Sequence, residues 1–235
     1  MTTGALDKPK IHLCRAELEH GRSVYEVICK ANDFNPLETI PGVFGKAEWQ
    51  TLLTKFAPGQ FVALADVNGA QQVVGVAISM RTSYLPSEPP KSWRDMIGDL
   101  SLSQHDPNGR WLYGVEKAVH PNFQGMGIGS ALYRAQFELV DSFSLDGMYA
   151  GGMLKGYKNY KDVMSIRSYG AKVVSGEIFD PTVSIQLRKG FKALSLIENY
   201  VWDHEAQHTG MLIVYEREQA HASIKETSSG SHLLL

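Results

Sequence analysis

The chain has 235 residues, of which 43% are hydrophobic and 20% are charged. This is the composition of a globular protein that is long enough to bury a core without disulfides or a structural metal. Its 23 Lys and Arg nearly balance 25 Asp and Glu, and no basic run exceeds a pair. Nucleic acid is therefore excluded as a general partner, because nonspecific binding needs a clustered positive field.

Cysteine content and hydropathy indicate where the protein works. Cys14 and Cys29 show no metal or redox spacing, which is typical of a reduced, cytoplasmic protein. The polar start has no signal-peptide core, and the longest apolar runs are far below the ~20 residues that span a bilayer. We therefore expect no membrane association. We also expect a disordered N-terminus (residues 1–10), one domain (residues 11–216) and a mobile tail (residues 217–235).

Apolar periodicity and turn signals predict the order of the elements. Strands are expected at residues 11–13, 61–67, 72–80, 111–119, 147–153, 191–200 and 211–215. Helices are expected at residues 16–30, 47–56, 93–97, 130–140 and 181–189. Asn68-Gly69 is a strong hairpin signal between the second and third strands. The long connection over residues 81–110 predicts a functional insertion.

A glycine-punctuated turn lies between the strand at residues 111–119 and the helix that follows it. It reads Gln124-Gly125-Met126-Gly127-Ile128-Gly129-Ser130. Glycines allow close approach of the backbone to a ligand, and a helix start presents unpaired N–H groups and a positive dipole end. This arrangement suits a phosphate or pyrophosphate.

Three classes of nucleotide-binding loop share this general form. A Walker P-loop is excluded, because Ser130-Ala131 stands where Lys-Ser/Thr is required. A dinucleotide fingerprint can be placed on Gly125, Gly127 and Ser130 with Asp146 as the acidic residue, but Asp146 precedes a strand instead of ending one. An oxidoreductase therefore remains a weaker alternative, which NAD(P) binding in place of coenzyme A would reveal.

The third class fits better. The spacing Gln124-x-x-Gly127-x-Gly129, preceded by Val119-His120-Pro121-Asn122-Phe123, resembles the pyrophosphate-binding loop of the GNAT superfamily of N-acyltransferases. The resemblance implies an α/β (α+β) fold: a central, mixed, mostly antiparallel twisted sheet of about seven strands with a splayed parallel pair, flanked by helices.

A narrower resemblance extends over most of residues 11–216. It is to the GNAT module found fused to nitrilase-like carbon–nitrogen hydrolases, and no hydrolase domain is seen in these residues. The segments that carry it are Tyr113-Gly114-Val115-Glu116, Ala150-Gly151-Gly152, Gly156-Tyr157, Asp180-Pro181, Gln186 to Phe191, Asn199-Tyr200-Val201 and Asp203.

The resemblance implies a donor and a way of binding it. The donor is a coenzyme A thioester (acetyl-CoA or another acyl-CoA) or the phosphopantetheine of an acyl carrier protein, with no metal. Its binding residues would be Ala118 and Val119 for the pantetheine arm and, for the pyrophosphate, Gln124, Gly125, Met126, Gly127, Ile128, Gly129 and Ser130. Backbone N–H groups near Val119 would polarise the thioester carbonyl.

Glu116 and His120 are the candidate catalytic bases. A regular strand places Leu112, Gly114, Glu116, Ala118 and His120 on one face, so that small residues flank Glu116. Burial would raise the pKa of Glu116 toward the range that a base for an amine requires. A bulge in this strand would reverse that parity. The alternative for Glu116 is a surface ion pair, and for His120 a backbone hydrogen bond at the strand end.

The other wall of the pocket is expected to contain Gly151, Gly152, Tyr157 and Gln186. Many GNAT enzymes have a tyrosine at the position of Gln186, where it protonates the leaving thiolate. Glutamine cannot transfer a proton at neutral pH, so Tyr157, Tyr160, Tyr169 or water is left for that step. The glycine pair reads equally well as a bulge, and Asp180 as a helix cap. His204 and His208 lack a third metal ligand.

The leading hypothesis is an acyltransferase that acts by direct attack in a ternary complex on a small-molecule amine, with specialised metabolism as the setting that it suggests. A carrier protein would meet a basic patch of Arg134, Lys155, Lys158, Arg188 and Lys189. The second hypothesis is a non-catalytic acyl-CoA-binding module that partners a separate nitrilase-like hydrolase. The oligomeric state is left open, a homodimer included.

Overall fold

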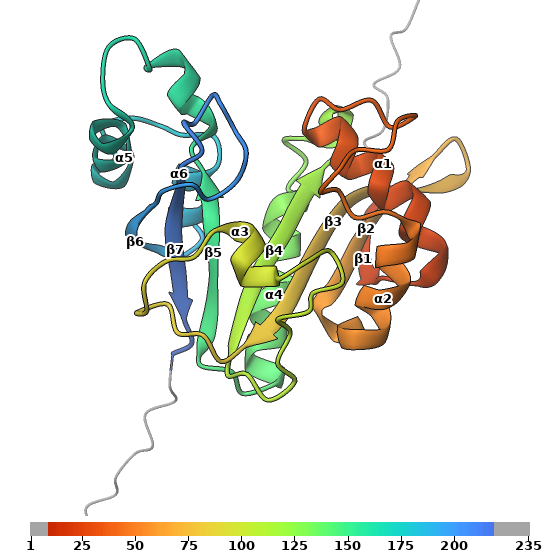
Figure 1. The fold of residues 1–235 in the computed structure, drawn as a ribbon. Helices are drawn as coiled ribbons and strands as arrows, with labels where there is room; N and C mark the ends of the chain where they lie inside the picture. The colour runs from red at the N-terminus through yellow and green to blue at the C-terminus, as the bar shows by residue number, and fades with distance from the viewer. Residues whose placement is uncertain (1–8, 219–235) are drawn as a thin grey trace, which may run out of the picture.

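The fold is built around one twisted seven-stranded sheet. The computed structural model describes residues 9–218, and its strands follow the order β1-β2-β3-β4-β5-β7-β6 (Figure 1). The strands are β1 (Ile11–Arg15), β2 (Gln60–Val67), β3 (Ala70–Thr82), β4 (Trp111–Val119), β5 (Gly147–Met153), β6 (Lys192–Ile197) and β7 (Gly210–Glu216). Only β4 and β5 pair in parallel, and every other neighbouring pair is antiparallel. The predicted mixed, mostly antiparallel sheet is confirmed.

Helices cover both faces of the sheet. On one face lie α1 (Gly21–Ala31), α2 (Lys46–Phe56) and α3 (Trp93–Ile97), with α3 in front of β4 (Figure 1). The other face is covered by α4 (Ile128–Ser142), with α5 (Ile166–Ser175) and α6 (Val183–Leu187) beside it. We call these the α1 face and the α4 face. Each face has its own hydrophobic core, so β4 and β5 are covered from both sides.

Most of the turns and helix ends lie where the sequence predicts them. Asn68 and Gly69 take φ of 51° and 80°, which forms the tight β2–β3 turn. The α1 helix begins later than expected, because residues 18–20 form a separate 3₁₀ turn, and α6 is shorter than the predicted helix at residues 181–189. The α5 helix was not predicted, although the Ser165 N-cap and Gly176 in the left-handed region mark its ends.

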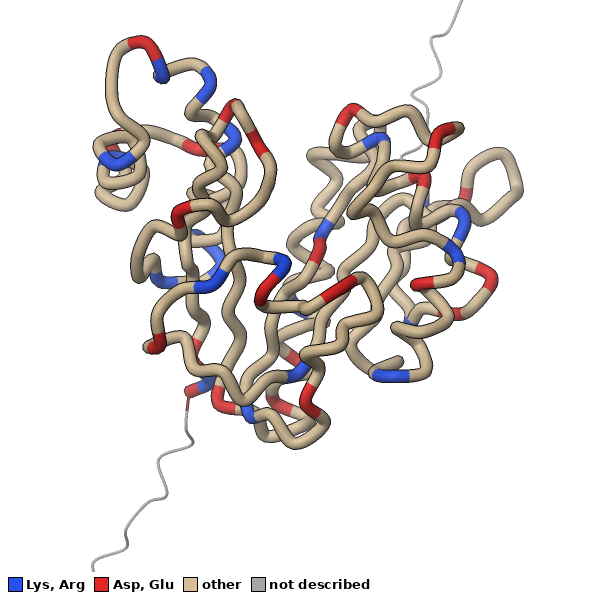
Figure 2. The backbone as a smooth tube through the Cα atoms, viewed as in Figure 1, with Lys and Arg blue, Asp and Glu red and all other residues tan. Residues whose placement is uncertain are grey.

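The distribution of charged and apolar residues agrees with what the composition indicates. Acidic and basic residues are interspersed around the described chain (Figure 2). None of the helices within residues 9–218 combines the length and apolarity needed to cross a bilayer. The predicted disorder at residues 1–10 and the predicted mobile tail at residues 217–235 fall almost wholly outside the described residues.

Candidate active site

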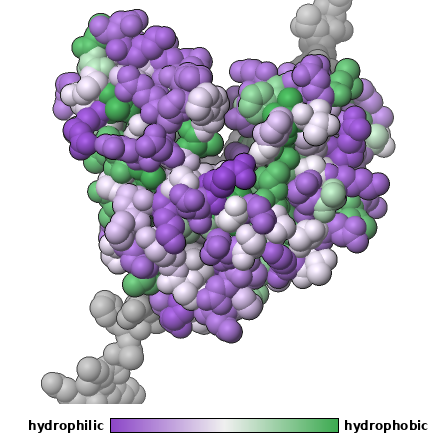
Figure 3. Space-filling view, in the orientation of Figure 1, coloured by the Kyte–Doolittle hydropathy of each residue, from purple (hydrophilic) through white to green (hydrophobic). Residues whose placement is uncertain are grey.

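The sheet opens between β4 and β5. The two strands pair only from Trp111 to Tyr113, opposite Gly147 to Tyr149, and then diverge toward the end of β4 that leads to the glycine loop (Figure 1). The surface shows a notch between the two halves at this open end (Figure 3). The diverging strands leave part of the inner edge of β4 without a strand partner, so a ligand can take that place.

One extra residue in β4 decides which side chains face which core. Glu116 lies opposite Ile78 and Gly114 lies opposite Ser79, so Val115 is a bulge. Glu116 and Ala118 consequently share the α1 face, whereas Leu112 and Gly114 share the α4 face. The alternation of a regular strand therefore does not hold here: the bulge, which the sequence left open, reverses the parity after Gly114.

The bulge also determines which amide groups point into the gap. His120 donates its N–H to the carbonyl of Val74 on β3, and amide directions alternate along a strand. The amide of Ala118 is therefore directed toward β3, while those of Lys117 and Val119 are directed toward the gap. The carbonyl of Val119 accepts a long contact from Gln124 Nε2 at 3.4 Å. Of the two predicted pantetheine partners, Val119 therefore directs its amide toward the gap, and Ala118 does not.

Glu116 lies at the bottom of this gap. Its carboxylate accepts a hydrogen bond from the N–H of Lys117 at 3.0 Å. Burial raises the pKa of Glu116 above its usual value, and the Lys117 amide and the positive charge of Lys155 offset only part of this. A carboxyl group whose pKa is raised by burial is suited to act as a base. The alternative of a surface ion pair, which would lower the pKa, does not fit.

Two tyrosines lie beside Glu116 on the α1 face. The hydroxyls of Tyr113 and Tyr200 are 3.1 Å apart, and burial raises the pKa of Tyr200 to about 12, with the negative charge of Glu116 adding to the shift. The ring of Tyr200 lies against Gly151, where a Cβ atom would come within 2.1 Å of it. No catalytic role was predicted for Tyr200, although it belongs to the segment 199–201 of the resemblance.

His120 is placed at the end of β4, above Glu116. Its Nδ1 accepts a hydrogen bond from the N–H of Asn122 at 3.2 Å, and its Nε2 lies 3.4 Å from Lys30 Nζ. Burial and the charge of Lys30 lower the pKa of His120, which keeps the imidazole neutral. Both ring nitrogens thus have neighbours that account for a structural role. His120 lines an open pocket of about 570 Å³ with the residues that end α1.

The glycine loop presents free N–H groups at the open end of the gap. Gly125 and Gly127 have φ of 75° and 83°, and Gly127 is the N-cap of α4. The first intrahelical bond runs from Ala131 to Gly127, so the N–H groups of Ile128, Gly129 and Ser130 have no partner within the helix. A Cβ atom at any of the three loop glycines would contact nothing within 4 Å in the described structure. This open cradle suits a diphosphate.

Gly152 and Gln186 form the α4 side of the gap. A Cβ atom at Gly152 would lie 2.3 Å from Gln186 Oε1, so the glycine pair in β5 permits close approach and is not a bulge, since β5 pairs regularly with β7. Gln186 Nε2 donates to the hydroxyl of Tyr133 on α4 at 2.9 Å. Burial raises the pKa of Tyr133 to about 12.

Tyr157 has a different position from the one expected. It lies in η4 (Lys155–Asn159), fully buried, and its hydroxyl donates to the carbonyl of Met164 at 3.0 Å. The hydroxyl of Tyr169 likewise donates to Asp180, which also caps α6 through the N–H of Val183. Tyr157 and Tyr169 thus pack behind the wall of the site, and the hydroxyl group of each already donates to another residue. Neither fits the predicted role of proton donor to the leaving thiolate.

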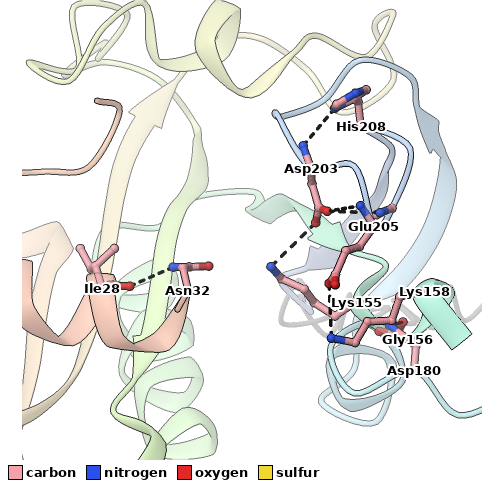
Figure 4. A network of polar contacts seen from close by, with 10 residues as sticks. Ile28, Asn32, Lys155, Gly156, Lys158, Asp180, Asp203, Glu205 and His208 are labelled. Atoms are coloured by element: carbon pink, nitrogen blue, oxygen red, sulfur yellow. Dashed lines mark hydrogen bonds and ion pairs between the residues drawn. The ribbon is translucent and has the colours of Figure 1, made fainter. Parts of the chain in front are cut away.

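A polar network lines the wall of the gap that faces the end of α1 (Figure 4). Lys155 Nζ points from η4 toward the gap and lies 3.8 Å from Asp203 Oδ2, while Lys158 pairs with Glu205 at 3.3 Å (Figure 4). Two lysines of the predicted carrier-protein patch are therefore neutralised by ion pairs. Lys155 is also near enough to Glu116 to affect its pKa.

Asp146 excludes the dinucleotide reading. Its carboxylate pairs with Arg110, and its N–H donates to the Arg110 carbonyl at 2.8 Å. Both residues precede the paired ends of β4 and β5, at the opposite end of the strands from the glycine loop. An acidic residue there cannot contact the ribose of a nucleotide that is bound at the loop.

Comparison with known proteins places the fold in a class. No protein-family model matches the chain. It is 32% identical over 154 residues to a probable hydrolase, YhcX, of Bacillus subtilis strain 168, a match that covers 66% of this chain and 29% of that relative. It is 29% identical over 161 residues to an uncharacterized N-acetyltransferase, YkwB, of the same organism, covering 68% of this chain and 70% of that protein. The chain thus spans less than a third of YhcX.

Solved structures agree on the architecture. The loading GNATL domain of CurA from Lyngbya majuscula superposes with a TM-score of 0.69 at 19% identity, covering 88% of this chain and 98% of that one. The GNAT-like decarboxylase GphF, in complex with isobutyryl-CoA, gives a TM-score of 0.67 at 16% identity, covering 87% and 98%. The chain has the GNAT fold.

Proposed function

We propose that the protein is an acyltransferase that moves an acyl group from a pantetheine thioester to the amine of a small molecule. One arrangement carries the proposal: a strand gap that contains a buried carboxylate, Glu116, opens directly onto a loop of unpaired N–H groups. The GNAT fold and the likeness to an N-acetyltransferase support it.

The donor would lie along the open edge of β4. Its diphosphate occupies the loop from Gly125 to Ser130, and the pantetheine arm pairs with the amide of Val119. This orientation brings the thioester to the bottom of the gap, next to Glu116. Coenzyme A and a carrier-bound phosphopantetheine share this arm, and the assay below distinguishes them.

The acceptor amine would approach from the α1 face. An alkylamine has a pKa near 10, so its deprotonation at pH 7 costs about 4 kcal/mol, and the Glu116 carboxylate relieves that cost by accepting the proton. The amine nitrogen attacks the thioester carbon, and the oxyanion is stabilised by a backbone N–H of β4. The tetrahedral intermediate then collapses, the C–S bond breaks and the amide is released.

The leaving thiolate needs a proton. Gln186 cannot supply it, but Gln186 donates its own N–H to the oxygen of Tyr133. The hydroxyl proton of Tyr133 is then free to be donated toward the gap, and Tyr133 takes the role that Tyr157 and Tyr169 cannot fill. The cysteines offer no covalent route in this site, because Cys29 is buried in α1 and Cys14 lies in β1.

The insertion over residues 81–110 favours a small acceptor. Its helix α3 lies over β4, and the N–H of Trp93 donates to the carbonyl of Tyr200 at 2.8 Å. The insertion thus ties the β4 side of the gap to the loop of residues 198–209. A gap bridged in this way favours a compact metabolite over a polypeptide chain.

The test is thiol release. The protein is incubated with acetyl-CoA, longer acyl-CoAs or acyl carrier proteins over a panel of amines, and free thiol is followed together with amide formation by mass spectrometry. Transfer that Glu116→Gln abolishes while thioester binding persists supports the proposal. Thioester binding with no transfer to any amine would instead support the non-catalytic module, with a separate hydrolase as its partner.

A further inference from the structure

A lysine is buried without an ionic partner beside the gap. Lys117 leaves β4 on the α4 face, opposite to Glu116, and its Nζ lies 2.6 Å from the centroid of the Tyr133 ring. The nitrogen is inaccessible to solvent and has no hydrogen-bond partner among residues 9–218. The residue as a whole is partly exposed, so its stem borders open space while its tip is covered.

Burying an ammonium group in this way is unfavourable. Burial lowers the pKa of Lys117 well below its usual value, and the face of the Tyr133 ring offsets only part of the lost hydration. An apolar side chain of similar length would fill the same space without this cost. The lysine therefore fits a role toward a ligand better than a role in packing.

A second orphaned atom belongs to the same cluster. Gln186 Oε1 is buried and has no hydrogen-bond partner among the described residues, while Gln186 Nε2 is bonded to the hydroxyl of Tyr133. Lys117, Tyr133 and Gln186 thus form one continuous group from β4 across α4 to α6, against Gly152 of β5. Lys117 Nζ is thus an unused donor and Gln186 Oε1 an unused acceptor, and both residues contact Tyr133.

The chemistry of the thioester donor limits which ligand group can pair with Lys117. This step rests on the proposed function. The phosphates of coenzyme A belong at the glycine loop, at the far end of β4, and the pantetheine arm carries no charge. The acyl group is then the part of the intact donor that can bring an anion to Lys117. A carboxylate on the acyl group would give Lys117 the ionic partner that it lacks among the described residues and would form a charge-assisted hydrogen bond with it.

We propose that the acyl group transferred by this protein carries a carboxylate, as in malonyl or succinyl thioesters, and that Lys117 is the residue that recognises it. The carboxylate lies on the α4 face, away from Glu116, so β4 separates it from the base. An amide N–H of the pantetheine arm suits the free Gln186 oxygen.

The test compares binding of coenzyme A, acetyl-CoA, malonyl-CoA and succinyl-CoA by isothermal titration calorimetry. Wild type should bind one of the carboxylated thioesters about tenfold or more tightly than acetyl-CoA, the range of one charge-assisted hydrogen bond. Lys117→Met should abolish the difference while retaining acetyl-CoA binding, which also shows that the variant is folded. Lys155→Met, on the other wall of the gap, should affect acetyl and carboxylated thioesters alike.

A second readout needs no variant. If Lys117 is neutral when free and charged when paired, binding of the preferred carboxylated thioester to wild type takes up a proton that acetyl-CoA binding does not. Titrations in buffers of different ionisation enthalpy measure this.

Equal affinity of wild type for acetyl and both carboxylated thioesters would overturn the inference and leave the acyltransferase proposal standing. So would a uniform loss of affinity for all four ligands in Lys117→Met, because the lysine would then serve the arm or the thiol. Absence of binding to every coenzyme A and carrier-bound thioester would refute the proposed function itself.

Discussion

Trp93 Nε1 donates a hydrogen bond to the carbonyl oxygen of Val115 at 2.8 Å. Val115 is the extra residue of the β4 bulge, and a bulged residue lacks its full set of ladder hydrogen bonds. The insertion that contains Trp93 thus supplies a hydrogen-bond donor for the Val115 carbonyl that β3 does not supply. Val115 directly precedes Glu116. The shape of the strand at the candidate base depends on a segment about twenty residues away in the chain.

Replacement of Trp93 tests this dependence. Trp93→Phe keeps an aromatic ring but leaves the Val115 carbonyl without its donor, so the free energy of unfolding should fall by about 1–3 kcal/mol. Urea denaturation measures the change. Trp202→Phe is the matched control, because Trp202 is 80% exposed and should have almost no effect. Equal stability of the two variants would show that the hydrogen bond does not support the bulge.

Replacement of Glu116 tests catalysis. Glu116→Gln preserves shape and the acceptor oxygen for the Lys117 amide but removes the base, so kcat for amide formation should fall about 10²-fold or more. Affinity for the thioester, measured by calorimetry, should change little. Glu198→Gln, which breaks an exposed pair with Arg167, should leave both quantities unchanged. A Glu116→Gln variant with full activity would assign the proton transfer to another group.

The raised pKa of Glu116 also predicts how stability depends on pH. The native state holds the proton more tightly than the unfolded chain, whose glutamate titrates near 4.5. The resulting stabilisation is complete below that pH and is lost as the pH rises through the higher native pKa. Relative to Glu116→Gln, wild type should therefore become less stable between pH 4.5 and neutrality, as followed by denaturant unfolding at several pH values. A constant difference would mean that Glu116 is not desolvated.

The glycine loop can be tested with a second glycine as control. Gly127 and Gly69 both have positive φ, 83° and 80°, and a Cβ atom would meet nothing within 4 Å at either. Alanine should cost roughly 1–2 kcal/mol of stability at each position. Gly127→Ala alone should also weaken coenzyme A binding, by about tenfold or more, because its methyl group enters the cradle of N–H groups. Equal affinities of the two variants would place the diphosphate elsewhere.

Local features of this protein could be read from its sequence. The bounds of β4 and β5, the Asn68-Gly69 hairpin and the glycine loop before α4 each depend on residues next to one another in the chain. So does Asp180, whose Oδ1 accepts hydrogen bonds from the N–H groups of Thr182 and Val183 at 2.8 Å. The α5 helix could also have been found, since Ser165 and Gly176 bound it. Propensity and capping act over a few residues, and a sequence displays them directly.

The site itself could be read only in part. Glu116 was a candidate base from the sequence, but its face was assigned by simple alternation, and the position of the bulge at Val115 appears only in the pairing of β4 with β3. Tyr133 could not be connected with Gln186 from the sequence, because they lie 53 residues apart and meet across two helices.

By itself the sequence therefore determined the order of most of the elements, the glycine loop before α4 and the residue types available for chemistry. The tertiary structure alone decided that Glu116 and Lys117, adjacent in the chain, leave opposite faces of the sheet and that neither forms a salt bridge within residues 9–218. Desolvation depends on every segment packed around a side chain, and those segments come from positions throughout the chain.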